Sequence, residues 1–569
     1  MVLLALCVAA VVSVPSATVG AEGVDRDVEF RDPNVGGRGY QIVIFKDQVV
    51  GGTGGLSFSY LHSGGPWGST CTSLSDPACA DDKSKVWYHA LLQPCTTTEQ
   101  LDCISGFGAA TESNDRTPGS FVGTFPSRGR HDYVGDAALR LPNGGPPGVW
   151  SIPSRPHAGG TSYLVQVSTS GNYRDAGFSL NSFSIEVVPI ELVSDDGRGC
   201  DLNKECDADE GPGFYVVEEI DGKPILGLAS RVSSSDNDCI VLAERQCAKR
   251  HAFPPDARLY LTLRMSQSPT GWFHGRVYKP NISVTPLLGS AVMVDIEAST
   301  VKTPVVAVAM AWSELPASLQ DLYRATGGFK GAEPGTRNRP ELHLGPEIRN
   351  AISSPSPSSD VGMEELLAWL PHVGDRATAD IARWTIRSLA DNELSGASRC
   401  FTDRSQLNGL VTTNATQYSG GPPKFDRASG SLDYRVAAPH YTSGGNLVRG
   451  TYDLIMRSSV ARCVYGFSNA PLNASISVVE NNGQTTVATK SVSERDGWIR
   501  IAAYGFGFSS PTIKVQLTQE QSEKTPTDSP SKAKVPASKK RTIVCRKGRV
   551  VRKVSAVNPI CPKGFTKTP

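Results

Sequence analysis

The sequence of 569 residues lacks the short motifs by which several enzyme classes are recognised. It contains no G-x-S-x-G nucleophile elbow, no H-E-x-x-H zinc motif and no Walker loop, and its nine histidines are scattered. No stretch approaches the roughly 20 consecutive apolar residues that a membrane-spanning helix needs. The sequence therefore predicts no catalytic residue, no cofactor and no transmembrane segment.

The first residues predict an export signal. Residues 2–14 form an apolar run that is long enough for the core of a signal peptide and too short to span a bilayer. Small residues follow at Val19, Gly20 and Ala21, so we expect cleavage after Ala21 and a signal peptide at 1–21. The usual positive residues before the core are missing. The alternative is a buried first strand or helix.

The cysteines predict disulfide bonds in an oxidising compartment. Cys7 would leave with the signal peptide, and an even number remains in local groups. The gaps are mostly too long for a zinc site, the competing interpretation. Each group of four allows three pairings, and the sequence does not choose among them. The candidate cysteines are Cys71, Cys79, Cys95 and Cys103; Cys200, Cys206, Cys239 and Cys247; Cys400 and Cys463; Cys545 and Cys561.

Composition and strand patterns predict a mainly β, multidomain protein built from β-sandwich-like units. Glycine (56) and proline (39) are plentiful, and the hydrophobic fraction is 39%. We expect a β-rich domain with four cysteines at 22–189 and a second such domain at 190–352. A Pro/Ser linker at 353–361 and a helical segment at 362–396 follow. The chain then ends in a β-sandwich at 397–519, a disordered tether at 520–541 and a basic hairpin at 542–569.

Two local patterns place elements near the last sandwich. Apolar residues at helical spacing predict a helix over 363–384, with Asp360 as its N-cap and a break at Pro371. Farther on, Asn482-Gly483 joins two alternating runs and predicts a hairpin.

The C-terminal end is strongly basic although the whole chain has a net charge of only +1. Residues 529–569 hold twelve Lys and Arg and no Asp or Glu, so residues 1–528 carry a net charge of −11. A cluster this dense attracts polyanions, and the attraction weakens as salt rises. We expect an anionic envelope polymer or polysaccharide as the partner, and not nucleic acid. The alternatives are docking of the tail on the acidic body, or solubility alone.

The basic end also predicts a small folded module. The text "TIVCRKGRVVRKV" reads as a hairpin that turns at Lys547-Gly548 and is closed by Cys545 and Cys561. So small a unit needs a covalent staple because it buries little surface. The candidate binding cations are Arg546, Lys547, Arg549, Arg552 and Lys553.

The stretch "GWFHGR" is a second candidate binding site. Trp272 could stack on a sugar ring, while His274 and Arg276 could pair with a carboxylate. The alternative is a strand with a buried tryptophan.

The stretch "CDLNKECDADEGPG" is a weak calcium candidate because oxygen ligands stand at alternate positions. Cys206 occupies the sixth position, where an EF-hand needs glycine, and no glutamate stands at the twelfth. The alternative is an acidic surface loop. The candidate ligands are Asp201, Asn203, Asp207 and Asp209, and the sequence predicts no other metal site.

Three stretches resemble modules of uncharacterised exported actinobacterial proteins. They are the region containing "ARCVYGFSNAPLNASISVV", the later "GWIRIAAYGFGFSSPTIKVQL", and the closing "TIVCRKG" with "NPICPKG". The resemblance covers about a quarter of the chain and carries no known activity. It implies a bacterial extracellular protein and supplies no catalytic residue.

Together these features predict a secreted binding or structural protein of the cell envelope, held extracellularly or at the cell wall by its basic C-terminal module. An extracellular hydrolase with a site assembled from distant residues is the first alternative, and a ligand-sensing ectodomain is the second. The ligand and the oligomeric state stay open.

Overall fold

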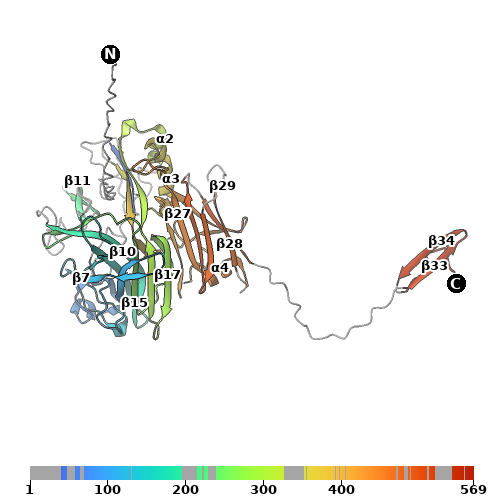
Figure 1. Ribbon diagram of the computed structural model, residues 1–569, viewed down its shortest axis with the longest axis horizontal. Coiled ribbons are helices and arrows are strands. Elements are labelled where there is room, and N and C mark those ends of the chain that lie inside the picture. Colours follow the sequence, from blue (N-terminus) through green and yellow to red (C-terminus); the bar gives the residue numbers. More distant parts are fainter. Residues whose placement is uncertain are drawn as a thin grey trace, which may run out of the picture. The chain divides into compact units, whose positions relative to one another are not determined.

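The structure is a computed structural model in which the chain forms two compact units, Met1–Gln519 and Glu520–Pro569 (Figure 1). It describes residues 40–568, with gaps at 48–57, 65–68, 114, 130, 195–213, 221–222, 229–238, 326–350, 354, 391–392, 396, 404, 469–471, 480–484, 487–488, 509–511, 520–540 and 557. The predicted signal peptide lies outside the described residues, as does nearly all of the predicted tether.

The prediction of a mainly β fold is confirmed. Strands make up 54% of the structure and helices 10%. Figure 1 shows the first unit as several layers of strands with short helices beside them. None of the described helices is long and apolar enough to cross a membrane.

The largest sheet has 15 strands among the described residues, and its main path runs β3-β2-β4-β9-β10-β22-β16-β23-β27-β31-β30. Neighbours on this path are antiparallel except β16 and β23, which are parallel. The strands are β2 (Tyr60–Ser63), β3 (Ser69–Cys71), β4 (Val86–Leu91), β7 (Ser120–Thr124), β8 (Gly148–Ser151), β9 (Ser162–Arg174), β10 (Gly177–Ser194), β13 (Cys239–Ala243), β14 (Gln246–Arg250), β16 (Gly271–Arg276), β22 (Thr385–Ser388), β23 (Leu407–Thr413), β27 (Gly450–Arg457), β30 (Thr489–Arg495) and β31 (Trp498–Phe506).

Two smaller sheets pack against this one. The first runs β17-β18-β15-β5-β6, and the second runs β24-β26-β32-β28-β29 with β25 also paired to β26. The strands of the first are β5 (Cys103–Ala110), β6 (Arg116–Pro118), β15 (Arg258–Met265), β17 (Tyr278–Pro286) and β18 (Val292–Ser299). Those of the second are β24 (Gln417–Tyr418), β25 (Lys424–Asp426), β26 (Ser431–Ala437), β28 (Leu472–Val479), β29 (Thr485–Thr486) and β32 (Thr512–Gln519).

The large sheet has a hydrophobic core on each face. Leu410 of β23 and Ile455 of β27 belong to the core shared with the five-stranded sheet. Val411 and Leu454, their neighbours in sequence, belong to the core shared with the six-stranded sheet. Successive strand residues point to opposite faces, so this alternation makes a two-sided, sandwich-like arrangement.

A further sheet and two helices complete the first unit. The sheet runs β20-β1-β19-β21, and β1 lies between an antiparallel and a parallel neighbour. Its strands are β1 (Tyr40–Phe45), β19 (Val301–Ala311), β20 (Ala351–Ser353) and β21 (Ala379–Arg383), and the helices packed on it are α2 (Ala317–Ala325) and α3 (Asp360–Trp369). The remaining elements are α1 (Pro77–Ala80), α4 (Ser458–Tyr465), the pair β11 (Phe214–Ile220) and β12 (Lys223–Leu228), and short 3-10 turns at Lys83–Lys85, Ala137–Leu139, Trp312–Glu314 and Leu370–His372.

The predicted helix over 363–384 is half right. The helix α3 starts at Asp360, and Ser359, not Asp360, is its N-cap, with the Ser359 hydroxyl accepting from the Gly362 N–H. Helical structure stops at the turn Leu370–His372, which contains Pro371. The residues after it form β21 and β22 instead, because their apolar side chains enter the cores of two sheets.

The predicted domain boundaries do not separate compact units within the first 519 residues. The boundary expected at 189/190 falls inside β10, which is one continuous strand. Strands β5 and β15, from the two predicted N-terminal domains, pair with each other. Strand β22, from the predicted helical segment, lies between β10 and β16. The three expected β domains are therefore parts of shared sheets.

Four disulfides settle most of the cysteine pairing. Cys71 bonds Cys79 and Cys95 bonds Cys103, which chooses one of three connectivities in the first group. The predicted pairs Cys400–Cys463 and Cys545–Cys561 are confirmed. In the second group Cys247 is disulfide-bonded.

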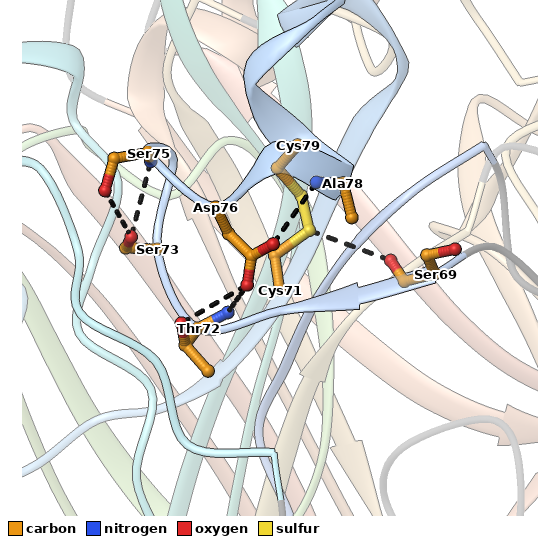
Figure 2. Close-up of a disulfide and its surroundings, with 8 residues drawn as sticks. All are labelled: Ser69, Cys71, Thr72, Ser73, Ser75, Asp76, Ala78 and Cys79. Carbon is orange, nitrogen blue, oxygen red and sulfur yellow. Dashed lines mark hydrogen bonds between the residues drawn. A yellow bond between two sulfur atoms is a disulfide. The ribbon is translucent and has the colours of Figure 1, made fainter.

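Asp76 caps the N-terminus of helix α1 beside the Cys71–Cys79 disulfide. Figure 2 shows Asp76 accepting hydrogen bonds from the Thr72 N–H and hydroxyl and from the Ala78 N–H at the start of α1. The carboxylate satisfies a free N–H of that helix, and these backbone bonds lower the pKa of Asp76. The cap and the Cys71–Cys79 bond together fix this turn.

Candidate functional site

The candidate strand "GWFHGR" is β16, and it lies in the interior of the first unit. All six of its residues are buried, and Trp272 is only 1% exposed. The Trp272 ring packs edge-on against Phe401, with ring centroids 5.2 Å apart. A sugar ring at the surface has no access to this tryptophan, so the alternative of a buried-tryptophan strand describes it.

His274 and Arg276 are also buried, on the same face of β16. The His274 ring stacks on Tyr418 at 3.8 Å with an interplanar angle of 4°. Arg276 donates to Asp47 at 2.7 Å and to the carbonyls of Thr413 and Ala415. Burial holds the pKa of His274 well below its usual range, and the charge of Arg276 adds to this. These contacts tie β16 to its neighbours and leave no free cation for a ligand.

The calcium candidates Asp201, Asn203, Asp207 and Asp209 lie outside the described residues. Within the described parts of the chain, no group of three or more His, Cys, Asp and Glu side chains is placed to hold a metal ion.

The basic C-terminal end forms a three-stranded sheet in the second unit. Its order is β34-β33-β35, with bounds Arg541–Lys547 for β33, Val550–Ala556 for β34 and Thr566–Lys567 for β35. The predicted turn is confirmed, because Lys547 pairs with Val550 and Gly548 has φ 58°, a value that favours glycine. Cys545 is fully buried beside its bond to Cys561, so the disulfide is the centre of this small module.

The five candidate cations are all exposed on this hairpin, and they are Arg546, Lys547, Arg549, Arg552 and Lys553. Because side chains alternate along a strand, the adjacent Arg546 and Lys547 project from opposite faces. The register places Arg552 opposite Cys545 and Lys553 opposite Val544, which also puts one cation on each face. A single flat surface would contact only part of this set, whereas a flexible chain could reach both faces.

Exposed apolar side chains accompany the cations in the same three-stranded module. Val550 and Val551 are 56% and 55% exposed, and Ile560 is 82% exposed. The guanidinium of Arg552 lies over the Phe565 ring at 5.7 Å. The module therefore presents aliphatic and aromatic surface between its charges.

The first unit contains a large pocket that the sequence analysis did not find. It has a volume of about 1400 Å³, and we call it the loop pocket because loops between strands supply most of its lining. Its cationic side chains are Arg155, Arg258, Lys302 and Arg449. Its acidic side chains are Glu112, Asp256 and Asp380.

Some of these charges are already paired. Arg258 donates to Glu297 at 2.8 Å, and Lys279 donates to Glu112 at 2.8 Å beside the pocket. The Glu297 carboxylate also accepts from Arg116 at 3.1 Å, so it is shared by two guanidinium groups. In the described part of the chain, no ion pair is formed by Arg155 or Arg449.

One wall of the loop pocket is the loop between β26 and β27, and two carboxylates hold it. The Asp375 carboxylate accepts from the His440 N–H at 2.9 Å and bonds the His440 ring at Nδ1. Asp380 accepts from both the N–H and the hydroxyl of Ser443, at 2.8 and 2.6 Å. Arg376 donates to the Ser443 carbonyl from the same side. Hydrogen bonds to Asp375, Arg376 and Asp380 thus fix the loop, and Asp380 and Ser443 also line the pocket.

This wall comes nearest to the catalytic arrangements that a hydrolase would need. Asp375 pairs with His440, and Ser443 follows His440 by three residues in the sequence. The Ser443 hydroxyl, however, donates to Asp380 rather than to the histidine. In a catalytic triad the serine hydroxyl donates a hydrogen bond to the histidine, which acts as the general base. These residues therefore do not form a Ser-His-Asp triad.

A buried acid stands close to the pocket. Burial raises the pKa of Asp453 to about 6, while hydrogen bonds from Tyr504 and Thr412 oppose that rise. The Tyr504 ring packs edge-on against Tyr278, a lining residue, with centroids 4.9 Å apart. Tyr504 therefore links the buried acid to the pocket.

The loop pocket left no recognisable sequence signal because its residues come from at least six separate segments. The one local hint is the polar, glycine-containing text "YTSGGN" of its wall, which is typical of a loop and of no particular ligand. A scan against protein-family models found no match, and searches of curated proteins and of solved structures found no similar chain either.

Proposed function

We propose that this chain is an exported, envelope-associated binding or structural protein that its basic C-terminal module attaches non-covalently to an anionic polymer. The observation that carries the proposal is the segregation of charge. Residues 529–569 hold twelve cations and no acid, and the five cations of the hairpin are exposed. The rest of the chain is acidic, so the two parts favour different partners.

The chemistry of the module suits such an attachment. Several cations on one short hairpin bind a polyanion jointly, and each contact releases counterions, which makes the affinity strongly dependent on salt. Cations on both faces favour a flexible polymer that can bend around the hairpin over a rigid plane. The disulfide Cys545–Cys561 supports an oxidising compartment, because such bonds persist mainly outside the cytosol.

The identity of the polymer is narrowed by the expected location. Outside a bacterial cell the abundant polyanions are teichoic-type wall polymers, acidic polysaccharides and anionic lipid headgroups. The resemblance of residues 542–564 to the C-terminal element of exported actinobacterial proteins supports the wall as the site of attachment. Nucleic acid is a poor partner for an exported protein.

The test is sedimentation of the purified protein with isolated actinobacterial cell walls across a salt series. Three forms are compared: the chain without residues 1–21, the same chain ending at Gln519, and a triple variant of the hairpin. The triple variant is Arg549→Gln, Arg552→Gln and Lys553→Gln. Its matched control removes the same charge from exposed positions of the first unit, as Lys83→Gln, Arg399→Gln and Arg427→Gln.

We expect the full chain to bind at low salt and to be released as salt rises. The truncated form should stay in solution, and the hairpin variant should bind at least tenfold more weakly with a shallower salt dependence. The control variant should bind like the unaltered chain. Equal binding by the full and truncated forms would refute the attachment and move the search for a ligand to the first unit.

A further inference from the structure

We propose that the loop pocket of the first unit binds a segment of an acidic oligosaccharide, in which carboxylated and uncharged sugars are both present. This site is separate from the basic module, and the proposal does not depend on the attachment function. Small-molecule pockets usually have volumes of about 300–1000 Å³. The volume of about 1400 Å³ exceeds that range and has room for several units of a chain.

The cations of the pocket fit carboxylate groups. Arg155 and Arg449 approach the pocket from the loop after β8 and from the end of the β26–β27 loop. Neither forms an ion pair among the residues that the structure describes, whereas Arg258 is held by Glu297. A guanidinium binds a carboxylate through two parallel hydrogen bonds, which adds direction to the attraction.

The acids and amides of the pocket argue against a ligand that is charged at every position. Asp256 and Asp380 line the same pocket and would repel a uniformly anionic chain. Carboxylate oxygens accept hydrogen bonds from hydroxyl groups, and Asn446 adds an amide that can both donate and accept. Uncharged sugars present many hydroxyls, so a chain that alternates hydroxyl-rich and carboxylated units satisfies both kinds of lining.

Apolar surface in the pocket fits the C–H faces of sugar rings. Phe253 and Tyr278 contribute aromatic surface, and Leu447 of the wall is 52% exposed. The Tyr278 ring is fixed by its contact with Tyr504, so little conformational entropy would be lost when a ligand packs on it. A polypeptide polyanion such as polyglutamate lacks these ring faces.

The wall is arranged before a ligand arrives. Asp375 and Asp380 hold the β26–β27 loop at His440 and Ser443, as described above. Within the loop, the Thr442 N–H donates to the Asn446 carbonyl at 2.8 Å and the Asn446 N–H donates to the Thr442 hydroxyl at 3.0 Å. Binding to a loop that is already ordered avoids the cost of ordering it.

The experiment is calorimetric titration of the full chain in which the hairpin carries Arg549→Gln, Arg552→Gln and Lys553→Gln. This background weakens the competing polyanion site. The probes are a hexamer of a uronic acid with alternate carboxyl groups reduced, a neutral hexaose of the same linkage, and polyglutamate of similar length. The pocket variant is Arg155→Glu with Arg449→Glu, and the control is Arg399→Glu with Arg427→Glu, which alters exposed residues elsewhere. Circular dichroism and melting temperature check that each variant is folded.

We expect the half-reduced uronic hexamer to bind at least tenfold more tightly than either the neutral hexaose or polyglutamate. The pocket variant should lose at least tenfold in affinity, and the control variant should bind like its parent. Equal affinity for the acidic and neutral hexamers, equal affinity for polyglutamate, or an unaffected pocket variant would each overturn the proposal. Failure of all probes to bind would overturn it as well, while leaving the wall-binding result for the basic module unchanged.

If the pocket variant is unfolded, Asn446→Ala replaces it. This exposed loop residue lines the pocket, and its loss should reduce affinity for the half-reduced hexamer by several-fold without a change in melting temperature. Unchanged affinity in a folded Asn446→Ala chain would count against the amide contact and therefore against the site.

Discussion

Trp272 and Phe273 are adjacent in β16, yet their rings lie in different hydrophobic cores. Trp272 packs on Phe401 in the core shared with the six-stranded sheet, and Phe273 stacks on Phe183 in the core shared with the five-stranded sheet. The large sheet is therefore a middle layer at this strand, and a change in β16 affects two cores at once. The same burial explains why a motif rich in aromatic and charged residues is structural.

Gly409→Ala tests the fit of Trp272. A Cβ at this position would lie 2.5 Å from the Trp272 ring and 2.6 Å from the Ile455 carbonyl oxygen. Because the backbone cannot move without disturbing both cores, we expect the free energy of unfolding to fall by about 1–3 kcal/mol. Urea denaturation measures the change. Gly507→Ala is the control, since no heavy atom lies within 4 Å of a Cβ there, and an equal loss in both variants would contradict the packing argument.

Asp453→Asn tests the buried acid beside the loop pocket. Burial raises the pKa of Asp453 to about 6 from an unfolded value near 4, so the folded state binds the proton more tightly. This contribution to stability is present below the unfolded pKa and is lost as pH rises through 6, by about 3 kcal/mol. Relative to the unaltered chain, the variant should therefore gain stability between pH 4 and pH 7. Denaturation at both pH values measures this, and a difference that does not change with pH would contradict it.

His89→Phe tests a buried histidine whose effect on stability has the opposite dependence on pH. The His89 ring stacks on Tyr60, and burial lowers its pKa to about 4, with the neighbouring His62 adding to the shift. The unfolded state takes up the proton first, so stability is complete above about pH 6.5 and falls by about 3 kcal/mol as pH drops through 4. The phenylalanine variant keeps the stacking and should resist acid better than the unaltered chain between pH 6.5 and 4. Thermal melting across this range is the measurement, and parallel curves for the two proteins would show that His89 does not titrate in this way.

Cys545→Ser with Cys561→Ser tests the staple of the basic module. Closing a loop of 16 residues contributes about 3 kcal/mol in the chain-entropy model, and this module has little other core. We expect the variant to lose the dispersed amide signals of β33 and β34 in NMR spectra while the first unit keeps its melting temperature. Binding to cell walls should decrease only a few-fold, because the cations remain. Retention of the β33–β34 signals would show that the hairpin is stable without the bond.

Much of the local structure could be predicted from residue patterns, whereas the pairing of strands that are far apart in sequence could not. The turn at Gly548 and the break at Pro371 follow from backbone chemistry within a few residues. The strands β21 and β22 could not be predicted, because residues 379–388 are strands only through pairing with β19 and β10, whose residues are far away in sequence.

The candidate site shows the same limit. Exposure of Arg549 and its neighbours could be predicted because a short hairpin has almost no interior. Burial of His274 could not, since it depends on Tyr418, which is 144 residues farther along the chain and stacks on it only after β24 and β16 are in place. The loop pocket was invisible for a similar reason, as Arg155 and Arg449 meet only in the folded chain.

The central position of β22 has a consequence for how the chain acquires its fold. Strand β22 at Thr385–Ser388 separates β10 from β16, so the large sheet cannot close around Ile185 and Phe273 until almost 390 residues have been synthesised. Strand β5 likewise waits for β15, more than 140 residues later. Such distant pairings make folding slow and leave sheet edges open in the incomplete chain. A ribosome-bound intermediate of this protein therefore exposes those edges until the later strands are made, whereas the strands of the C-terminal hairpin pair only with residues close by in sequence.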